Sequence, residues 1–145
     1  MYELRRATKK DSRQLRKIIK QVGINRFGVH WKRFFVLEKE GEIIGCVQLK
    51  THLASYQELT SLAILPAWQK KGLSSILMEA CIEASTKELF LVCDVELEPL
   101  YTRNGFQRHQ GKQLSLFHRI HLRISRTFWS TMANSTYPIL MIHIG

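Results

Sequence analysis

The segment Leu62-Ala63-Ile64-Leu65-Pro66-Ala67-Trp68-Gln69-Lys70-Lys71-Gly72-Leu73-Ser74-Ser75 joins an apolar run to a helical pattern through a basic turn. Residues Glu58–Leu65 read as a strand that Pro66 ends. After Gly72 the apolar residues recur at the spacing of one helix face: Leu73, Ile76, Leu77, Ala80, Cys81 and Ala84. The first amides of a helix lack intrahelical partners and carry the positive end of its dipole, which suits phosphate oxygens. Two interpretations remain open from the residues alone: a phosphate site at the start of this helix, or a solvated basic turn capped by glycine.

The rest of the chain alternates strand-like and helix-like patterns. Before the segment we predict a strand at Tyr2–Arg6, a helix within Lys9–Val22 that Thr8 caps and Gly23 ends, and a hairpin of strands at Phe34–Glu38 and Glu42–Leu53. Residues Asn25 to Arg33 fit either a short helix or a loop. After the segment we predict a strand at Leu89–Val95, a short helix between Pro99 and Gly105, a strand from Phe106 and a strand at Tyr137–Ile144. This order indicates a single α/β domain over residues 1–145 with a mostly antiparallel first half.

Composition limits the function classes. The formal net charge is +10, which favours an anionic partner such as nucleic acid, an anionic membrane surface or a phosphate-rich cofactor. No nucleic-acid-binding motif is recognised, so we disfavour nucleic acid as the partner. No apolar run approaches the roughly 18 residues of a membrane span, and no apolar stretch follows the first basic residues. The three cysteines, Cys46, Cys81 and Cys93, form no Cys-x-x-Cys pair, so we expect reduced thiols, no zinc site and a cytoplasmic protein.

Three motifs, in the same order, resemble the GCN5-related N-acetyltransferase (GNAT) superfamily. Gln69, Gly72 and Ser74 fill its acetyl-CoA motif, Gln/Arg-x-x-Gly-x-Gly/Ala, although Ser74 departs from the usual Gly or Ala. Glu42-Ile43-Ile44-Gly45 resembles the returning strand of the family's hairpin. Leu100-Tyr101-Thr102-Arg103-Asn104-Gly105-Phe106 resembles its late Leu-Tyr-x-x-x-Gly-Phe motif. The resemblance extends over about residues 1 to 110, and its three ordered motifs are far more specific together than the Gly72 motif alone.

The resemblance implies an acetyl-CoA-dependent N-acetyltransferase. The implied fold is a mixed, mostly antiparallel sheet that is splayed at the cofactor site and flanked by helices. The pantetheine arm of acetyl-CoA would lie against backbone groups of Leu62, Ala63 and Ile64. The pyrophosphate would lie on the amides that follow Gln69, which belong to Lys70, Lys71, Gly72, Leu73, Ser74 and Ser75. The acceptor would be a primary amine on a small molecule or peptide, and the residues do not specify which.

Direct acyl transfer from a thioester to an amine requires removal of an amine proton, stabilisation of an oxyanion and protonation of the leaving thiolate, and it requires no metal. Tyr101 matches the family's general acid, and a phenol with a pKa near about 10 can protonate a thiolate; the alternative is a core tyrosine with a solvated hydroxyl. Glu58 matches the strand position of a catalytic glutamate in histone-type members, and a surface carboxylate is the alternative. By strand parity Glu58 would share a face with Thr60, Leu62 and Ile64.

We expect the other polar residues of interest to have no catalytic role. Asp94 stands where many relatives place an Asn against the cofactor, and a carboxylate is poorly suited to that contact. Cys93 lies in an apolar strand and is expected to be a buried, inert thiol. His30, His52 and His118 are isolated in sequence and are expected to be structural or solvated. Because Ser74 departs from the motif and the base is unsettled, a catalytically degenerate module that binds CoA or a partner is the competing function.

Residues 111–132 form a basic amphipathic addition to the family pattern. The spacing of Leu114, Phe117, His121, Ile124 and Phe128 predicts a helix with one apolar stripe, and Lys112, Arg119, Arg123 and Arg126 are interspersed with it. One interpretation packs the stripe against the chain's own core or against a second copy in a homodimer. The other is a peripheral membrane or anionic-substrate surface, since Phe128 and Trp129 lie beside arginines.

Overall fold

The computed structural model describes residues 1–24, 28–53, 55–129 and 136–145. The chain forms two compact units, Met1–Lys87 and Glu88–Gly145, and each is described by itself. The expectations for residues 25–27, and for residues 130–132 at the end of the amphipathic segment, lie outside the described residues. None of the helices in the described part is long and apolar enough to cross a membrane.

The first unit is built on an antiparallel sheet. Its strands β1 (Glu3–Arg6), β2 (Phe34–Lys39), β3 (Glu42–His52) and β4 (Tyr56–Ile64) pair in the order of the sequence. The turn between β2 and β3 has positive φ at both central residues, 51° at Glu40 and 81° at Gly41, as a two-residue hairpin turn requires. The predicted strand and hairpin are therefore confirmed.

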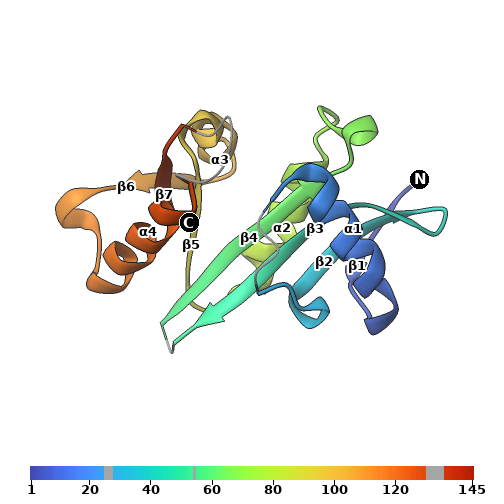
Figure 1. The fold of residues 1–145 in the computed structure, drawn as a ribbon, viewed down its shortest axis with the longest axis horizontal. Helices are drawn as coiled ribbons and strands as arrows, with labels where there is room; N and C mark the ends of the chain where they lie inside the picture. The colour runs from blue at the N-terminus through green and yellow to red at the C-terminus, as the bar shows by residue number, and fades with distance from the viewer. Residues whose placement is uncertain (25–27, 54, 130–135) are drawn as a thin grey trace. The chain divides into compact units, whose positions relative to one another are not determined.

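Two helices cover opposite faces of this sheet, α1 (Ser12–Val22) in front and α2 (Leu73–Ala84) behind in Figure 1. Under α1 lies a cluster of buried residues: Ala7, Leu15, Ile18, Ile19, Phe34, Val36, Ile43, Cys46 and Ala63. On the other face Gly45 lies so close to α2 that an added Cβ would be 3.2 Å from the Leu77 Cδ1 atom and 2.7 Å from the Ile64 Cδ1 atom. Gly45, in the hairpin motif, thus allows α2 to pack on the centre of the sheet.

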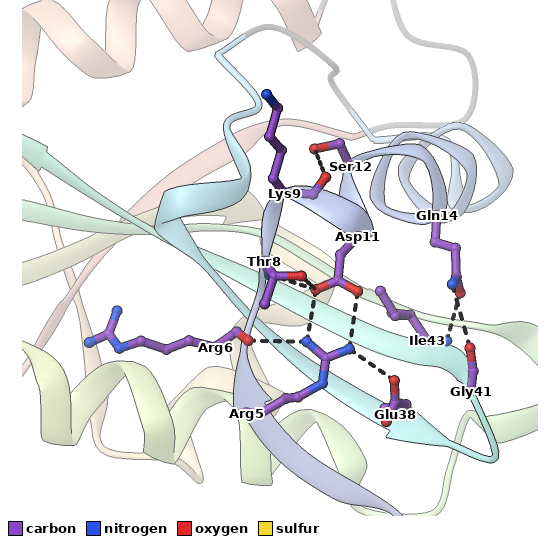
Figure 2. Close-up of polar contacts among 10 residues, drawn as sticks. All are labelled: Arg5, Arg6, Thr8, Lys9, Asp11, Ser12, Gln14, Glu38, Gly41 and Ile43. Carbon is purple, nitrogen blue, oxygen red and sulfur yellow. Dashed lines mark hydrogen bonds and ion pairs between the residues drawn. The ribbon is translucent and has the colours of Figure 1, made fainter.

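A partly buried ionic network fixes the entry to α1 (Figure 2). The two carboxylate oxygens of Asp11 accept hydrogen bonds from the Arg5 guanidinium at 2.8 and 3.0 Å, and one of them also accepts from the Thr8 backbone amide at 2.6 Å. Arg5 also donates to Glu38 on β2 at 2.9 Å. The Arg5 hydrogen bonds, with those from Thr8, lower the pKa of Asp11 against the opposing effect of burial. Thr8 is the N-cap of the short 3₁₀ turn Lys9–Asp11, and its backbone amide donates to Asp11. The N-cap of α1 itself is Asp11, so the predicted cap lies one short turn before the helix.

The second unit contains an antiparallel sheet of three strands. The strand β7 (Pro138–His143) lies between β5 (Glu88–Asp94) and β6 (Phe106–His109). The short helix α3 (Glu98–Thr102) and the longer helix α4 (Leu116–Trp129) complete the unit. With the first unit this gives a mixed α/β fold in which strand pairing is mostly antiparallel, which confirms the predicted fold class.

The amphipathic segment is helical as predicted, and its predicted stripe is confirmed in part: Leu114 is buried, and Phe117 and His121 contact Phe90. The inward side of α4 is marked by His118, 2% exposed, and Leu122, 7% exposed, and the ring of Phe90 on β5 contacts Phe117, His118 and His121. Ile124 and Phe128 belonged to the predicted stripe, yet both are exposed. Packing against Phe90 and β7 determines which side of α4 is buried. The spacing of apolar residues alone does not determine it.

Candidate active site

The turn between β4 and α2 is fixed by its own hydrogen bonds. Leu65 donates its amide to the Ile44 carbonyl at 2.9 Å, and residues Pro66–Trp68 form a 3₁₀ turn. The side-chain amide of Gln69 donates to the Ile64 carbonyl at 2.9 Å. Gln69 therefore connects the basic turn to the end of β4. These local hydrogen bonds determine where the N-terminus of α2 lies.

The α2 N-terminus has the features of an anion site. Gly72 is the N-cap with φ of 77°, and no side-chain hydrogen bond within the described residues caps this end. Lys70 also has positive φ, 63°, and both Lys70 and Lys71 are exposed. A Cβ added at Gly72 would meet nothing within 4 Å. The first-turn amides of Leu73, Ser74 and Ser75 thus lack intrahelical acceptors, face an open approach and have two lysines beside them.

A β-bulge interrupts β4 before this turn. Cys46 pairs with Ala63 and Gln48 pairs with Thr60, so β4 has one more residue than β3 between these pairs. Ser61 has φ of 56°, a left-handed conformation that is uncommon outside glycine. The extra residue changes the alternation of side chains, so Glu58 and Thr60 share a face with Ala63.

The prediction that Glu58 shares a face with Leu62 and Ile64 is therefore wrong, because strand parity does not hold across a bulge. Ala63 and Ile64 pair with β3, and the Ile64 carbonyl already accepts the Gln69 amide. Of the three residues predicted to lie along the pantetheine arm, Leu62 is the one at the bulge itself, where regular pairing is broken.

Glu58 is buried and paired with a histidine. Glu58 is only 7% exposed, and its Oε1 atom lies 2.8 Å from the His52 Nε2 atom. His52 ends β3 and Glu58 lies near the start of β4, so the hairpin brings them together. The expectation of an isolated His52 is therefore wrong. A carboxylate hydrogen-bonded to an imidazole can exchange a proton with it, which a carboxylate paired with arginine cannot do.

The sequence contained the signal that would have found this pair. A tight β3–β4 hairpin sets Lys50 opposite Glu58 and His52 opposite Tyr56. His52 and Glu58 are then diagonal neighbours on one face. The prediction started the second strand at Glu58, whereas β4 starts at Tyr56, and this concealed the register.

Tyr101 lies in the second unit, on α3. It is 7% exposed, and its ring makes an edge contact with Phe106 at a centroid distance of 6.0 Å. Burial, with a smaller contribution from Cys93, raises the pKa of Tyr101 well above the ordinary value for a phenol. The raised pKa keeps the hydroxyl protonated, and it also makes Tyr101 a weaker proton donor than an ordinary phenol.

The structure explains why glycine stands at position 105, in the Leu100–Phe106 motif. The backbone at Gly105 has φ of 90°, and an added Cβ would be 3.0 Å from the His143 Nε2 atom. The Asn104 side chain donates to the Leu100 carbonyl at 2.8 Å, which closes the turn after α3. This turn fixes the end of the helix that carries Tyr101.

Two further residues of the second unit have structural roles. Asp94 accepts hydrogen bonds from the Thr136 hydroxyl at 2.6 Å and the Glu96 amide at 3.0 Å. Burial opposes ionisation of Asp94, yet these hydrogen bonds outweigh it and lower its pKa. Burial raises the pKa of Cys93 to about 12, helped by the charges of Asp94 and Glu98, so this thiol is not a nucleophile at neutral pH.

Comparisons with known proteins agree with this geometry. A family model described as the acetyltransferase (GNAT) domain matches residues 30–108. An uncharacterised N-acetyltransferase of Chlorobaculum tepidum is 34% identical over 86 residues, which are 57% of this chain and 50% of that protein. The chain therefore spans about half the length of this curated relative.

Solved structures share the fold. The N-acetylglutamate synthase of Neisseria gonorrhoeae, complexed with coenzyme A and N-acetyl-glutamate, has a TM-score of 0.76 at 22% identity and covers 99% of this chain, which is 35% of that protein. The Mycobacterium tuberculosis protein Rv2747, in complex with CoA, has a TM-score of 0.75 at 16% identity and 99% coverage of both chains. The matched residues 30–108 are more than half of the chain, and the chain belongs to the GCN5-related N-acetyltransferase (GNAT) superfamily.

Proposed function

We propose that this chain transfers an acetyl group from acetyl-CoA directly to a primary amine. The observation that carries the proposal is the α2 N-terminus, whose capping residue and basic turn occupy the family's acetyl-CoA motif. The amides from Lys70 to Ser75 would bind the pyrophosphate oxygens, and Lys70 and Lys71 would add positive charge. Solved relatives of this fold are complexed with coenzyme A, which supports the same ligand here.

Leu62, Ala63 and Ile64 are proposed to align the pantetheine arm through backbone groups. The β4 bulge supports this role, because it breaks regular pairing next to these residues and so releases backbone polar groups from the ladder. Gln69 would act indirectly, by fixing the turn through the Ile64 carbonyl.

For the chemistry, we propose Glu58 as the base that accepts the amine proton. Its hydrogen bond to His52 gives that proton a second site. The amine nitrogen then forms a bond to the thioester carbon, and the carbon–sulfur bond breaks. Tyr101 would donate its proton to the departing thiolate and regain one from water, so the products are an N-acetyl amine and CoA thiol. The proposed acceptor is a primary amine, and the N-acetyl-glutamate bound to a structural relative makes amino acids the first group to test.

Steady-state release of CoA thiol, measured with acetyl-CoA and a panel of amino acids, polyamines and peptides, tests the proposal. Turnover with at least one amine is the expected result. Tyr101→Phe should lower kcat by about a hundredfold while CoA affinity changes little, because packing is kept and only the proton donor is lost. Wild-type kcat in Tyr101→Phe would remove Tyr101 from the mechanism. Saturable CoA binding without turnover on any amine would favour the degenerate CoA-binding module.

A further inference from the structure

The outward face of α4 presents an apolar row to solvent. Leu116 is 74% exposed, Ile120 52%, Ile124 54% and Phe128 43%. These residues, hereafter the exposed row, are four positions apart, so they form a nearly continuous line about 18 Å long on one side of the helix. The side of α4 that carries His118 and Leu122 is buried, with exposed fractions of 2% and 7%, and His118 contacts Phe90. The exposed row is therefore separate from the core of its unit.

Positive charge accompanies the exposed row without any compensating acid. Arg119, Arg123 and Arg126 are exposed, and α4 contains neither Asp nor Glu. Within the described residues none of these arginines forms an ion pair, and Arg119 makes only a 3.5 Å contact with the Gly111 carbonyl. On a helix of 3.6 residues per turn the three arginines lie along one border of the exposed row.

From this arrangement we propose that the outward face of α4 binds an anionic membrane surface. A helix that combines an exposed apolar face with arginines along its border lies in the plane of a lipid interface, with its apolar side chains below the headgroups. Each arginine near an anionic surface contributes about 1 kcal/mol of attraction, and its guanidinium can bind lipid phosphate in a bidentate manner.

The alternative is that a second copy of this chain covers the outward face of α4, and the charge of the helix disfavours it. Two α4 helices packed through their exposed rows would bring two sets of arginines together, and neither helix has an acid to pair with them. The whole chain adds to this repulsion with its formal net charge of +10. An anionic bilayer covers the same apolar area and gives the arginines counter-charges. The proposal concerns α4 alone and does not depend on acetyl transfer.

Co-sedimentation with vesicles tests the proposal on the full chain. Vesicles of phosphatidylglycerol and phosphatidylcholine in equal parts should bind the wild type at about 0.05 M salt, and vesicles of phosphatidylcholine alone should bind it much less. Ile120→Gln/Ile124→Gln removes apolar contacts, and Arg119→Glu/Arg123→Glu reverses two charges. Each double variant should lower the partition coefficient by at least about tenfold.

The matched control is Arg13→Glu/Arg16→Glu on α1, which makes the same change in net charge at two exposed positions of the other unit. It should keep most of the binding, and thermal melts should show all variants folded. Equal loss in the control would overturn the proposal, because binding would then follow net charge alone. No binding to anionic vesicles at low salt would also overturn it. So would a dimer in gel filtration that Ile120→Gln/Ile124→Gln dissociates.

Discussion

Two buried carboxylates of the first unit, Asp11 and Glu58, differ in the partner that the structure describes for each. Asp11 is 6% exposed and bonded to the Arg5 guanidinium and to Thr8, whereas Glu58 is 7% exposed and bonded to His52. Arginine stays protonated in proteins, so the Arg5–Asp11 pair can fix the local structure but cannot transfer a proton. An imidazole ring nitrogen can either donate or accept a proton. Burial alone therefore does not mark a catalytic carboxylate, and the chemistry of its partner is the sharper criterion.

The largest expected effect is on catalysis at Glu58. Glu58→Gln keeps the shape of the side chain but removes the proposed base, so kcat should fall by about a hundredfold or more. The acidic limb of the pH–rate profile should flatten in the variant. Unchanged kcat and an unchanged profile would assign the base role to another group or to water, and the contrast with Asp11 would then disappear.

The converse is expected at Asp11. Asp11→Asn removes a charge-assisted pair with Arg5, so the free energy of unfolding at pH 7 should fall by about 1–3 kcal/mol while kcat stays near wild type. Because the native pKa of Asp11 is lowered, its stabilisation is present above the unfolded pKa of about 3.9 and is lost as pH falls through the native value. The difference in the free energy of unfolding between the two proteins, measured by denaturant melts, should therefore be smaller near pH 3 than at pH 7. A constant difference at both pH values would contradict the ionic account.

A smaller effect is expected at His118, a buried titratable group in the second unit. Burial lowers its pKa, and the charges of His109 and His121 act in the same direction, while Glu88, 4.0 Å away, opposes them. The unfolded chain then binds more protons than the folded one as pH falls below about 6.5, so stability decreases on acidification. Thermal midpoints measured between about pH 7 and 5 should decline less steeply in His118→Gln than in the wild type. Parallel slopes would remove His118 as the source of acid sensitivity.

The elements that the sequence predicts are those with local signals. Gly23 ends α1 with φ of 83° as predicted, and α2 begins directly after Gly72. The β4 bulge has no such local signal. Ser61 has positive φ where β4 shifts register against β3, and the residues next to Ser61 in the sequence do not indicate this conformation. The His52–Glu58 pair depends on hairpin register, and the buried face of α4 depends on Phe90 in a strand far away in the sequence. Local pattern thus predicts the turn between β4 and α2, while side-chain partners and buried faces depend on tertiary packing.

The central claim is that the α2 N-terminus binds the phosphates of acetyl-CoA, and a matched pair of variants tests it most directly. Asp and Asn are both small and both tolerate the left-handed conformation of Gly72, so Gly72→Asp and Gly72→Asn differ mainly by one negative charge. The measurement is the rise in thermal midpoint that acetyl-CoA produces in each folded protein. We predict a clear rise in the wild type, most of it kept in Gly72→Asn and nearly all of it lost in Gly72→Asp. An equal rise in the two variants would contradict the claim and locate the cofactor elsewhere.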